Sequence, residues 1–308
     1  MDTALLELGQ LLKERSYSFI QPSVADIKRH RRSPPAGTAV VDDLFGWGVP
    51  VAQGAIDAPL RTAMRRAGVL ESEQPDAGVT SSVRAASVAG QLCFHTSGPG
   101  AARDAVFIGP DTYSFIAALE TALQAALTET SEPARILEVG CGSGAASIWL
   151  ARRFPQGQVI GCDINPAALR LAELNRRLAG VDNLSFAYSD VVAGVAGDFD
   201  VIVSNPPFIA DSQERTYRNG GGVYGLELPL RIVTEALGRL SKGGRMLMFT
   251  ASPVIDARHV FATELDARSI KHTLHELEAE AFVDSLGLPA YQGVERIASV
   301  LLAVGAVT

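Results

Sequence analysis

The sequence is poor in cysteine. Its three cysteines, Cys93, Cys141 and Cys162, are widely spaced and form no Cys-x-x-Cys pair, so we expect reduced thiols and no metal site. The histidines do not flank these cysteines at ligand spacing. His272 and His275 could share one helix face, but they lack a nearby acidic partner, and we interpret them as surface residues.

Long apolar runs are also missing. A run such as residues 297–304 is far shorter than the ~20 residues of a membrane-spanning helix, so we expect no membrane segment. Asp2, Glu7 and Glu14 interrupt the basic and apolar pattern that a secretory signal needs at the start of the chain. Both observations predict a cytoplasmic protein.

Basic residues are not in excess. The chain has 27 basic and 34 acidic residues, which gives a net charge of −7 and disfavours tight, sequence-independent binding of nucleic acid. The one dense basic run, residues 28–32, is followed by Ser-Pro-Pro at 33–35 and is typical of an exposed loop. It has two interpretations, a solvated turn or an arm that contacts RNA.

The length of 308 residues predicts about two domains, and the pattern changes near residue 104. We expect a smaller N-terminal α+β domain over residues 1–103. It has helices over 3–15 and 57–67 and a hairpin within 79–95 that turns at Gly90. Helices followed by a hairpin resemble a winged-helix module. Such a module could recognise the substrate, form a homodimer or bind nucleic acid.

Residues 104–308 alternate apolar strands with amphipathic helices, which predicts an α/β domain with a doubly wound parallel sheet. The last two strands could add an antiparallel C-terminal edge strand. We expect strands at 135–139, 159–162, 184–188, 199–203, 245–250, 272–278 and 296–304, and helices at 145–154, 166–179, 226–240 and 256–271.

A glycine-rich turn, Gly-Cys-Gly-Ser-Gly at 140–144, joins the first of these strands to its helix. In doubly wound sheets ligands bind at the carboxyl ends of the strands, and glycine lets the backbone approach the ligand closely. Asp163 follows the second strand, where a carboxylate can accept hydrogen bonds from ribose hydroxyls. Asp190 follows the third, where it can bind an adenine amino group beside the backbone of Val191. Together these features predict an adenosine pocket.

Asn-Pro-Pro-Phe at residues 205–208 directly follows a buried strand and is the most specific feature of the chain. The two prolines stiffen the turn and fix the side chain of Asn205 and the carbonyl of Pro206. Those two oxygens can accept both hydrogens of a planar amino group, and Phe208 can stack on a flat substrate. The alternative interpretation is a rigid loop with an aromatic plug.

These motifs resemble class I S-adenosylmethionine-dependent methyltransferases that methylate amines. They are most similar to the HemK/PrmC-type protein-glutamine N5-methyltransferases and the small-domain rRNA guanine-N2 enzymes. The resemblance covers roughly residues 104–304, and it implies a Rossmann-like fold with S-adenosyl-L-methionine as cofactor. Gly-Pro-Asp-Thr-Tyr at 109–113 keeps the Pro and Thr of a segment that closes over the cofactor in the glutamine enzymes. In Gly-Gly-Val-Tyr-Gly-Leu at 221–226, Tyr224 stands where that family has Asp.

The resemblance implies a cytoplasmic enzyme that transfers a methyl group to a conjugated amine of a protein, nucleic acid or small molecule. A protein glutamine amide is the main hypothesis, guanine N2 or adenine N6 of RNA or DNA the alternative, and a small-molecule amine a further one. A non-catalytic scaffold has no need of the rigid Asn-Pro-Pro turn. The catalytic candidates are Asn205, Pro206, Pro207 and Phe208. The cofactor-binding candidates are Thr112, Glu138, Gly140, Cys141, Gly142, Gly144, Asp163, Ile164, Asp190, Val191 and Asn205.

Overall fold

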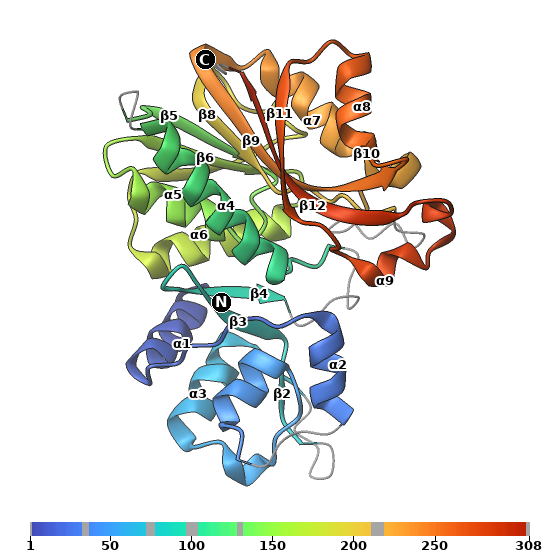
Figure 1. Cartoon of the computed structure of the whole chain (residues 1–308). Coiled ribbons are helices and arrows are strands. Elements are labelled where there is room, and N and C mark those ends of the chain that lie inside the picture. The colour runs from blue at the N-terminus through green and yellow to red at the C-terminus, as the bar shows by residue number, and fades with distance from the viewer. Residues whose placement is uncertain are drawn as a thin grey trace.

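A computed structural model describes residues 2–32, 37–71, 78–96, 104–127, 132–210 and 219–305. Within these ranges the chain forms a large sheet covered by helices on both faces, with a smaller N-terminal part beneath it, blue to cyan in Figure 1. The Ser-Pro-Pro expected to form part of a basic loop lies outside the described residues. No helix in the described ranges has the length and apolarity needed to cross a membrane.

The large sheet has the strand order β11-β12-β9-β8-β5-β6-β7, with β10 paired to β9. Strands β5 to β9 pair in parallel, while β12 runs antiparallel to both β9 and the outermost strand β11. The predicted doubly wound sheet with an antiparallel edge is therefore confirmed. The strands are β5 (Arg135–Val139), β6 (Gln158–Asp163), β7 (Leu184–Tyr188), β8 (Phe199–Ser204), β9 (Leu240–Ile255), β10 (Arg258–His259), β11 (His272–Glu278) and β12 (Arg296–Gly305).

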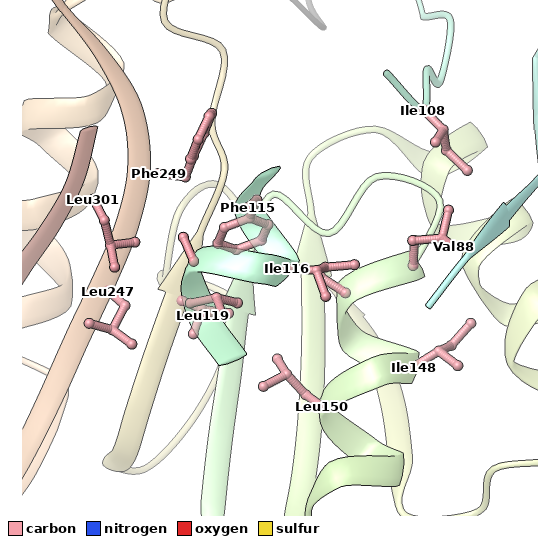
Figure 2. Packing of buried hydrophobic residues seen from close by; sticks show 14 of the residues in the cluster. Val88, Ile108, Phe115, Ile116, Leu119, Ile148, Leu150, Leu247, Phe249 and Leu301 are labelled. Atoms are coloured by element: carbon pink, nitrogen blue, oxygen red, sulfur yellow. The ribbon is translucent and has the colours of Figure 1, made fainter. Parts of the chain in front are cut away.

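Alternate residues of each central strand enter two different cores, because successive side chains of a strand point to opposite faces. Ile136 packs with helices α4 and α5 on one face, and Leu137 packs with α7 and α8 on the other. Figure 2 shows Phe115 and Leu119 of α4 directed toward Leu247 of β9. The helices are α4 (Pro110–Leu127), α5 (Ala145–Arg153), α6 (Pro166–Ala179), α7 (Glu227–Leu237), α8 (Val260–Ala267) and the short α9 (Val283–Leu286).

The N-terminal part packs its helices and two small two-stranded sheets around a second apolar core, to which Leu174 and Leu178 of α6 also contribute. Leu8 and Leu12 of the first helix are fully buried there, as their helical spacing predicts. The expected hairpin also forms and turns at Ala89 and Gly90. The elements are α1 (Asp2–Glu14), α2 (Val24–Arg32), α3 (Ala58–Ala67), β1 (Leu70–Glu71), β2 (Thr80–Ser81), β3 (Val83–Val88) and β4 (Gln91–Thr96).

The basic run at residues 28–32 is not a loop. It forms the last turns of α2, and two of its residues are held by contacts within the N-terminal part. His30 is buried and stacks on Trp47 with the ring centroids 3.9 Å apart, while Arg29 pairs with Asp26 at 2.6 Å. The expectation of a loop was wrong, because the stacking of His30 on Trp47 on one side of the run stabilises a helix, whereas residues 28, 29, 31 and 32 are exposed as expected.

The suggested shared helix face of His272 and His275 was also wrong. Both residues lie in strand β11, and residues three apart in a strand point to opposite faces. All three cysteines are free, and all three are buried.

Asn175 of α6 joins the N-terminal part to the large sheet. Its side chain is fully buried, and Oδ1 accepts a hydrogen bond from the backbone N–H of Phe94 at 2.8 Å. The side-chain Nδ2 donates to the carbonyls of Phe94 and Ser143, both at 2.9 Å. Because Ser143 belongs to the glycine-rich turn, a single side chain ties hairpin strand β4 to that turn.

We expect Asn175→Ala to lower the free energy of unfolding by roughly 2–4 kcal/mol, because three buried backbone groups lose their partner. Urea denaturation followed by circular dichroism measures this change. The control is Arg177→Ala, an exposed residue of the same helix that should alter stability by less than about 0.5 kcal/mol. Equal stabilities of the two variants would contradict the role assigned to Asn175.

Candidate functional site

A cavity of about 230 Å³ lies where the carboxyl ends of β5, β6 and β8 meet. The residues that follow these parallel strands form its walls, as expected at this edge of a doubly wound sheet. All the candidate residues predicted from the sequence line this cavity, except Gly144 and Phe208. The lining candidates are Thr112, Glu138, Gly140, Cys141, Gly142, Asp163, Ile164, Asp190, Val191, Asn205, Pro206 and Pro207.

The glycine-rich turn leaves room beside its backbone. Gly140 and Gly142 have φ angles of +73° and +52°, which favour glycine, and a Cβ at either position would meet no atom within 4 Å. Gly144 does not line the cavity. It is the N-cap residue of α5 and has a φ of +78°, and a Cβ there would lie 3.0 Å from Ala172 and Phe186. The first two glycines therefore border open space, and the third is needed for packing.

Asp163 is tied to the same turn. One carboxylate oxygen accepts the backbone N–H of Gly142 at 2.9 Å, and the other accepts that of Asn165 at 2.8 Å. Burial raises the pKa of the carboxyl group, while these two bonds oppose that rise. Each carboxylate oxygen can accept more than one hydrogen bond, so Asp163 can hold the turn and still bind a hydroxyl group in the cavity.

Asp190 binds an arginine. Its two oxygens accept hydrogen bonds from Arg231 of α7 at 2.9 and 2.8 Å, and the pairing lowers the pKa of the carboxyl group. The next residue, Val191, has a φ of +52°, which is unusual for a β-branched residue. Its carbonyl accepts a bond from the Ser189 hydroxyl at 2.8 Å, and this bond helps to hold the backbone at the cavity wall.

Among the described residues, only the side-chain nitrogen of Asn205 has a hydrogen-bond partner, and its side-chain oxygen has none. Its Nδ2 donates to a carboxylate oxygen of Asp111 at 3.4 Å, whereas its Oδ1 is buried and has no hydrogen-bond partner there. Burial raises the pKa of Asp111, and the bond from Asn205 opposes that rise. Because Asp111 attracts the amide nitrogen, the oxygen is left to accept a hydrogen bond from another molecule.

Phe208 lies outside this cavity and lines a second, larger one of about 560 Å³. Its ring is buried and packs against Phe249 and Phe282, with centroid distances of 6.2 and 5.0 Å. The two cavities share the walls formed by Phe107, Asp111 and residues 205–207. Asn205 therefore stands at the junction between two spaces that could hold two different molecules.

Glu138 is a buried carboxyl group in the wall of the smaller cavity. Its side chain accepts a hydrogen bond from the hydroxyl of Ser147, and burial raises its pKa to about 8. This rise prevails over the opposing effect of the Ser147 bond, because a charged carboxylate loses most of its hydration at this depth.

Several lining residues were not among the sequence candidates. Asp111 lies in the segment 109–113, and a signal was present because the resemblance to the glutamine enzymes already covered that segment. Leu228 and Ile232 of α7 and Phe107 also line the smaller cavity. No local motif distinguishes these apolar residues from ordinary core residues, and the chain fold alone brings them to the site.

Part of the chain is similar in sequence to known methyltransferases. Residues 118–270 match the family model described as methyltransferase small domain. The chain is 36% identical over 127 residues to the release factor glutamine methyltransferase of Deinococcus radiodurans, covering 38% of this chain and 45% of that protein. It is 38% identical over 123 residues to a putative protein N5-glutamine methyltransferase of Methanocaldococcus jannaschii, covering 38% of this chain and 61% of that protein. The chain thus spans about half the length of these curated relatives.

Among solved structures, TYW2 of P. horikoshii in complex with MeSAdo aligns with a TM-score of 0.47 and 15% identity. The alignment covers 72% of this chain and 71% of that one.

We expect the free energy of unfolding to fall as pH rises from about 4.5 to about 8, in part because of Glu138. In this window the folded state keeps a proton that the unfolded state has lost, so stability decreases by up to about 1.4 kcal/mol per pH unit. Glu138→Gln is neutral at every pH and should flatten the dependence. Urea titrations of both proteins across this window measure the effect, and parallel curves would contradict the raised pKa.

Proposed function

Because residues 118–270 belong to the methyltransferase small domain family, we propose that the chain is an S-adenosyl-L-methionine-dependent N-methyltransferase. The names of its relatives point to the side-chain amide nitrogen of a protein glutamine as the acceptor. The observation that carries this proposal is the position of Asn205. Its buried oxygen, without a partner among the described residues, lies where the two cavities meet.

The smaller cavity fits the cofactor. Open space beside Gly140 and Gly142 leaves room for a ligand against the backbone, and the carboxylate of Asp163 can accept ribose hydroxyls. Ile164, 48% exposed although apolar, offers a surface for a flat base. When bound here, S-adenosyl-L-methionine supplies a methyl group carried on a positively charged sulfur.

The larger cavity receives the acceptor amide. Asn205 Oδ1 and the Pro206 carbonyl accept the two hydrogens of a planar NH₂ group and orient its nitrogen toward the smaller cavity. These oxygens also favour the positive charge that develops on the nitrogen during methylation, so catalysis depends on position and fixed dipoles. No strong base is required, because transfer of the methyl group leaves a positively charged nitrogen that is strongly acidic and loses its proton readily to water.

Asp111 serves as a positioning residue in this proposal. An asparagine side chain could rotate and present its NH₂ group to the substrate, where it would repel another donor. The bond from Asn205 Nδ2 to the Asp111 carboxylate favours the opposite orientation, with the oxygen directed to the acceptor. The carboxylate also adds negative charge near the nitrogen that becomes positive.

We expect Asn205→Ala to lower kcat by ~10²-fold or more, because it removes a fixed acceptor that acts on the developing charge. The affinity for the cofactor should stay within a few-fold, since the glycine turn and Asp163 are untouched. Methyl transfer to glutamine peptides from radiolabelled cofactor measures kcat, and calorimetry measures cofactor affinity. Unchanged turnover would remove Asn205 from the mechanism.

We expect Asp163→Ala to weaken cofactor binding by on the order of 2–3 kcal/mol, because charge-assisted hydrogen bonds are lost. Asp200→Ala is a matched control. The carboxylate of Asp200 also accepts two backbone N–H groups, at 2.9 and 3.0 Å, but it lies near the amino end of β8, away from the cavity. Calorimetry should show weaker binding for the first variant only, and normal binding by it would refute the assignment.

A further inference from the structure

The larger cavity has walls from parts of the chain that are far apart in sequence. Residues 23–25 at the start of α2, the first residues of α4, the loop at 205–209 and the segment at 278–285 all line it. It meets the smaller cavity at Asn205, so a molecule bound here can place a group beside the reacting centre. The nature of its walls therefore bears on which acceptor the enzyme takes.

Part of the wall is apolar. Phe208, Phe249 and Phe282 lie side by side, and neighbouring Val283 is 61% exposed although it is a large hydrophobic residue. Exposed apolar side chains beside a cavity are common where a protein binds another molecule.

The rim carries negative charge. Glu278, Glu280 and Asp284 line the cavity, are exposed, and form no ion pair within the described part of the chain. Nearby Glu276 differs, because its carboxylate pairs with Arg296 at 2.8 Å and with His259 at 3.1 Å. Among the described residues that line the two cavities there is no lysine or arginine. The rim thus presents three carboxylates whose charge the described neighbours do not neutralise.

We propose that this cavity binds a positively charged polypeptide segment, with its glutamine directed to Asn205 and flanking arginines or lysines toward Glu278, Glu280 and Asp284. The inference rests on the proposed function and names the kind of substrate that the same site selects. The charge of the rim supports the choice of a positively charged segment, and Asn205 Oδ1, which is buried and has no partner among the described residues, marks the inner end of the cavity to which the glutamine is directed. Complementary charge raises association rates and suppresses wrong partners.

The same charge disfavours a nucleic acid. Binding of RNA or DNA depends on lysine and arginine contacts to phosphates, whereas three carboxylates would repel them. The basic residues at 28–32 do not compensate. They belong to the same helix as Val24 and Ala25 of the wall, but none of them lines either cavity, and Arg29 is paired with Asp26 at 2.6 Å.

The test uses two peptides with one glutamine each. The first has arginine on both sides of the glutamine, and the second has citrulline, which is neutral and nearly the same shape, at those positions. Fluorescence anisotropy gives Kd, and methyl transfer from radiolabelled cofactor gives KM and kcat. We expect the arginine peptide to bind about tenfold more tightly, because exposed ion pairs each contribute modestly. The preference should shrink as salt is added.

Two triple variants separate the rim from the overall charge. Glu278→Gln, Glu280→Gln and Asp284→Asn together should remove the preference for the arginine peptide and leave the citrulline peptide within about twofold. The matched control is Glu120→Gln, Asp182→Asn and Asp198→Asn, which removes the same number of charges from exposed positions that line neither cavity. This control should keep the preference.

Equal affinity for the two peptides, or loss of the preference in the control variant as well, would overturn the inference. So would tighter binding of a single-stranded RNA oligonucleotide than of the arginine peptide. Preferential binding of the arginine peptide without methylation would support the charge selection and refute the glutamine reaction. Methylation of both peptides with the same KM would support the glutamine reaction and refute the charge selection.

Discussion

The site depends on the parallel pairing of β5 with its two neighbours. In the register of the sheet, Val139 lies beside Cys162 of β6 and beside Ser204 of β8. The residues that come next in each strand, Gly140, Asp163 and Asn205, therefore leave the sheet at the same edge. Because parallel strands end on one side, three chain segments far apart in sequence supply one cavity. Everything proposed about methyl transfer follows from that convergence.

The N-terminal part takes a direct share in this arrangement. Its hairpin is tied to the glycine turn through Asn175, and the hydroxyl of Tyr113 in α4 accepts the backbone N–H of Gln21 at 2.9 Å. The start of α2 then forms one wall of the larger cavity. A boundary near residue 103 separates two hydrophobic patterns in the sequence, but the larger cavity has walls from both sides of it. A molecule bound in this cavity would therefore contact the N-terminal part as well as the sheet.

Electrostatics divides the site into two environments. Glu138 and Asp111 lie in the wall of the smaller cavity, where burial raises the pKa of a carboxyl group. The carboxylates of Glu278, Glu280 and Asp284 face solvent at the outer rim. A buried carboxyl group orients its neighbours through hydrogen bonds, whereas an exposed one acts at longer range on an approaching partner.

The sequence alone determined which motifs follow the apolar strands: the glycine turn, Asp163 and the Asn-Pro-Pro-Phe loop each come directly after one, and that pattern is local. The sequence did not predict the helix at 28–32, because the stacking of His30 on Trp47 that holds this helix joins residues distant in the chain. Only the tertiary structure decided that Asp111 accepts a hydrogen bond from Asn205 and that Leu228 and Ile232 of α7 line the smaller cavity. Those contacts link positions whose residue types are ordinary in their own surroundings, so no spacing along the chain could reveal them.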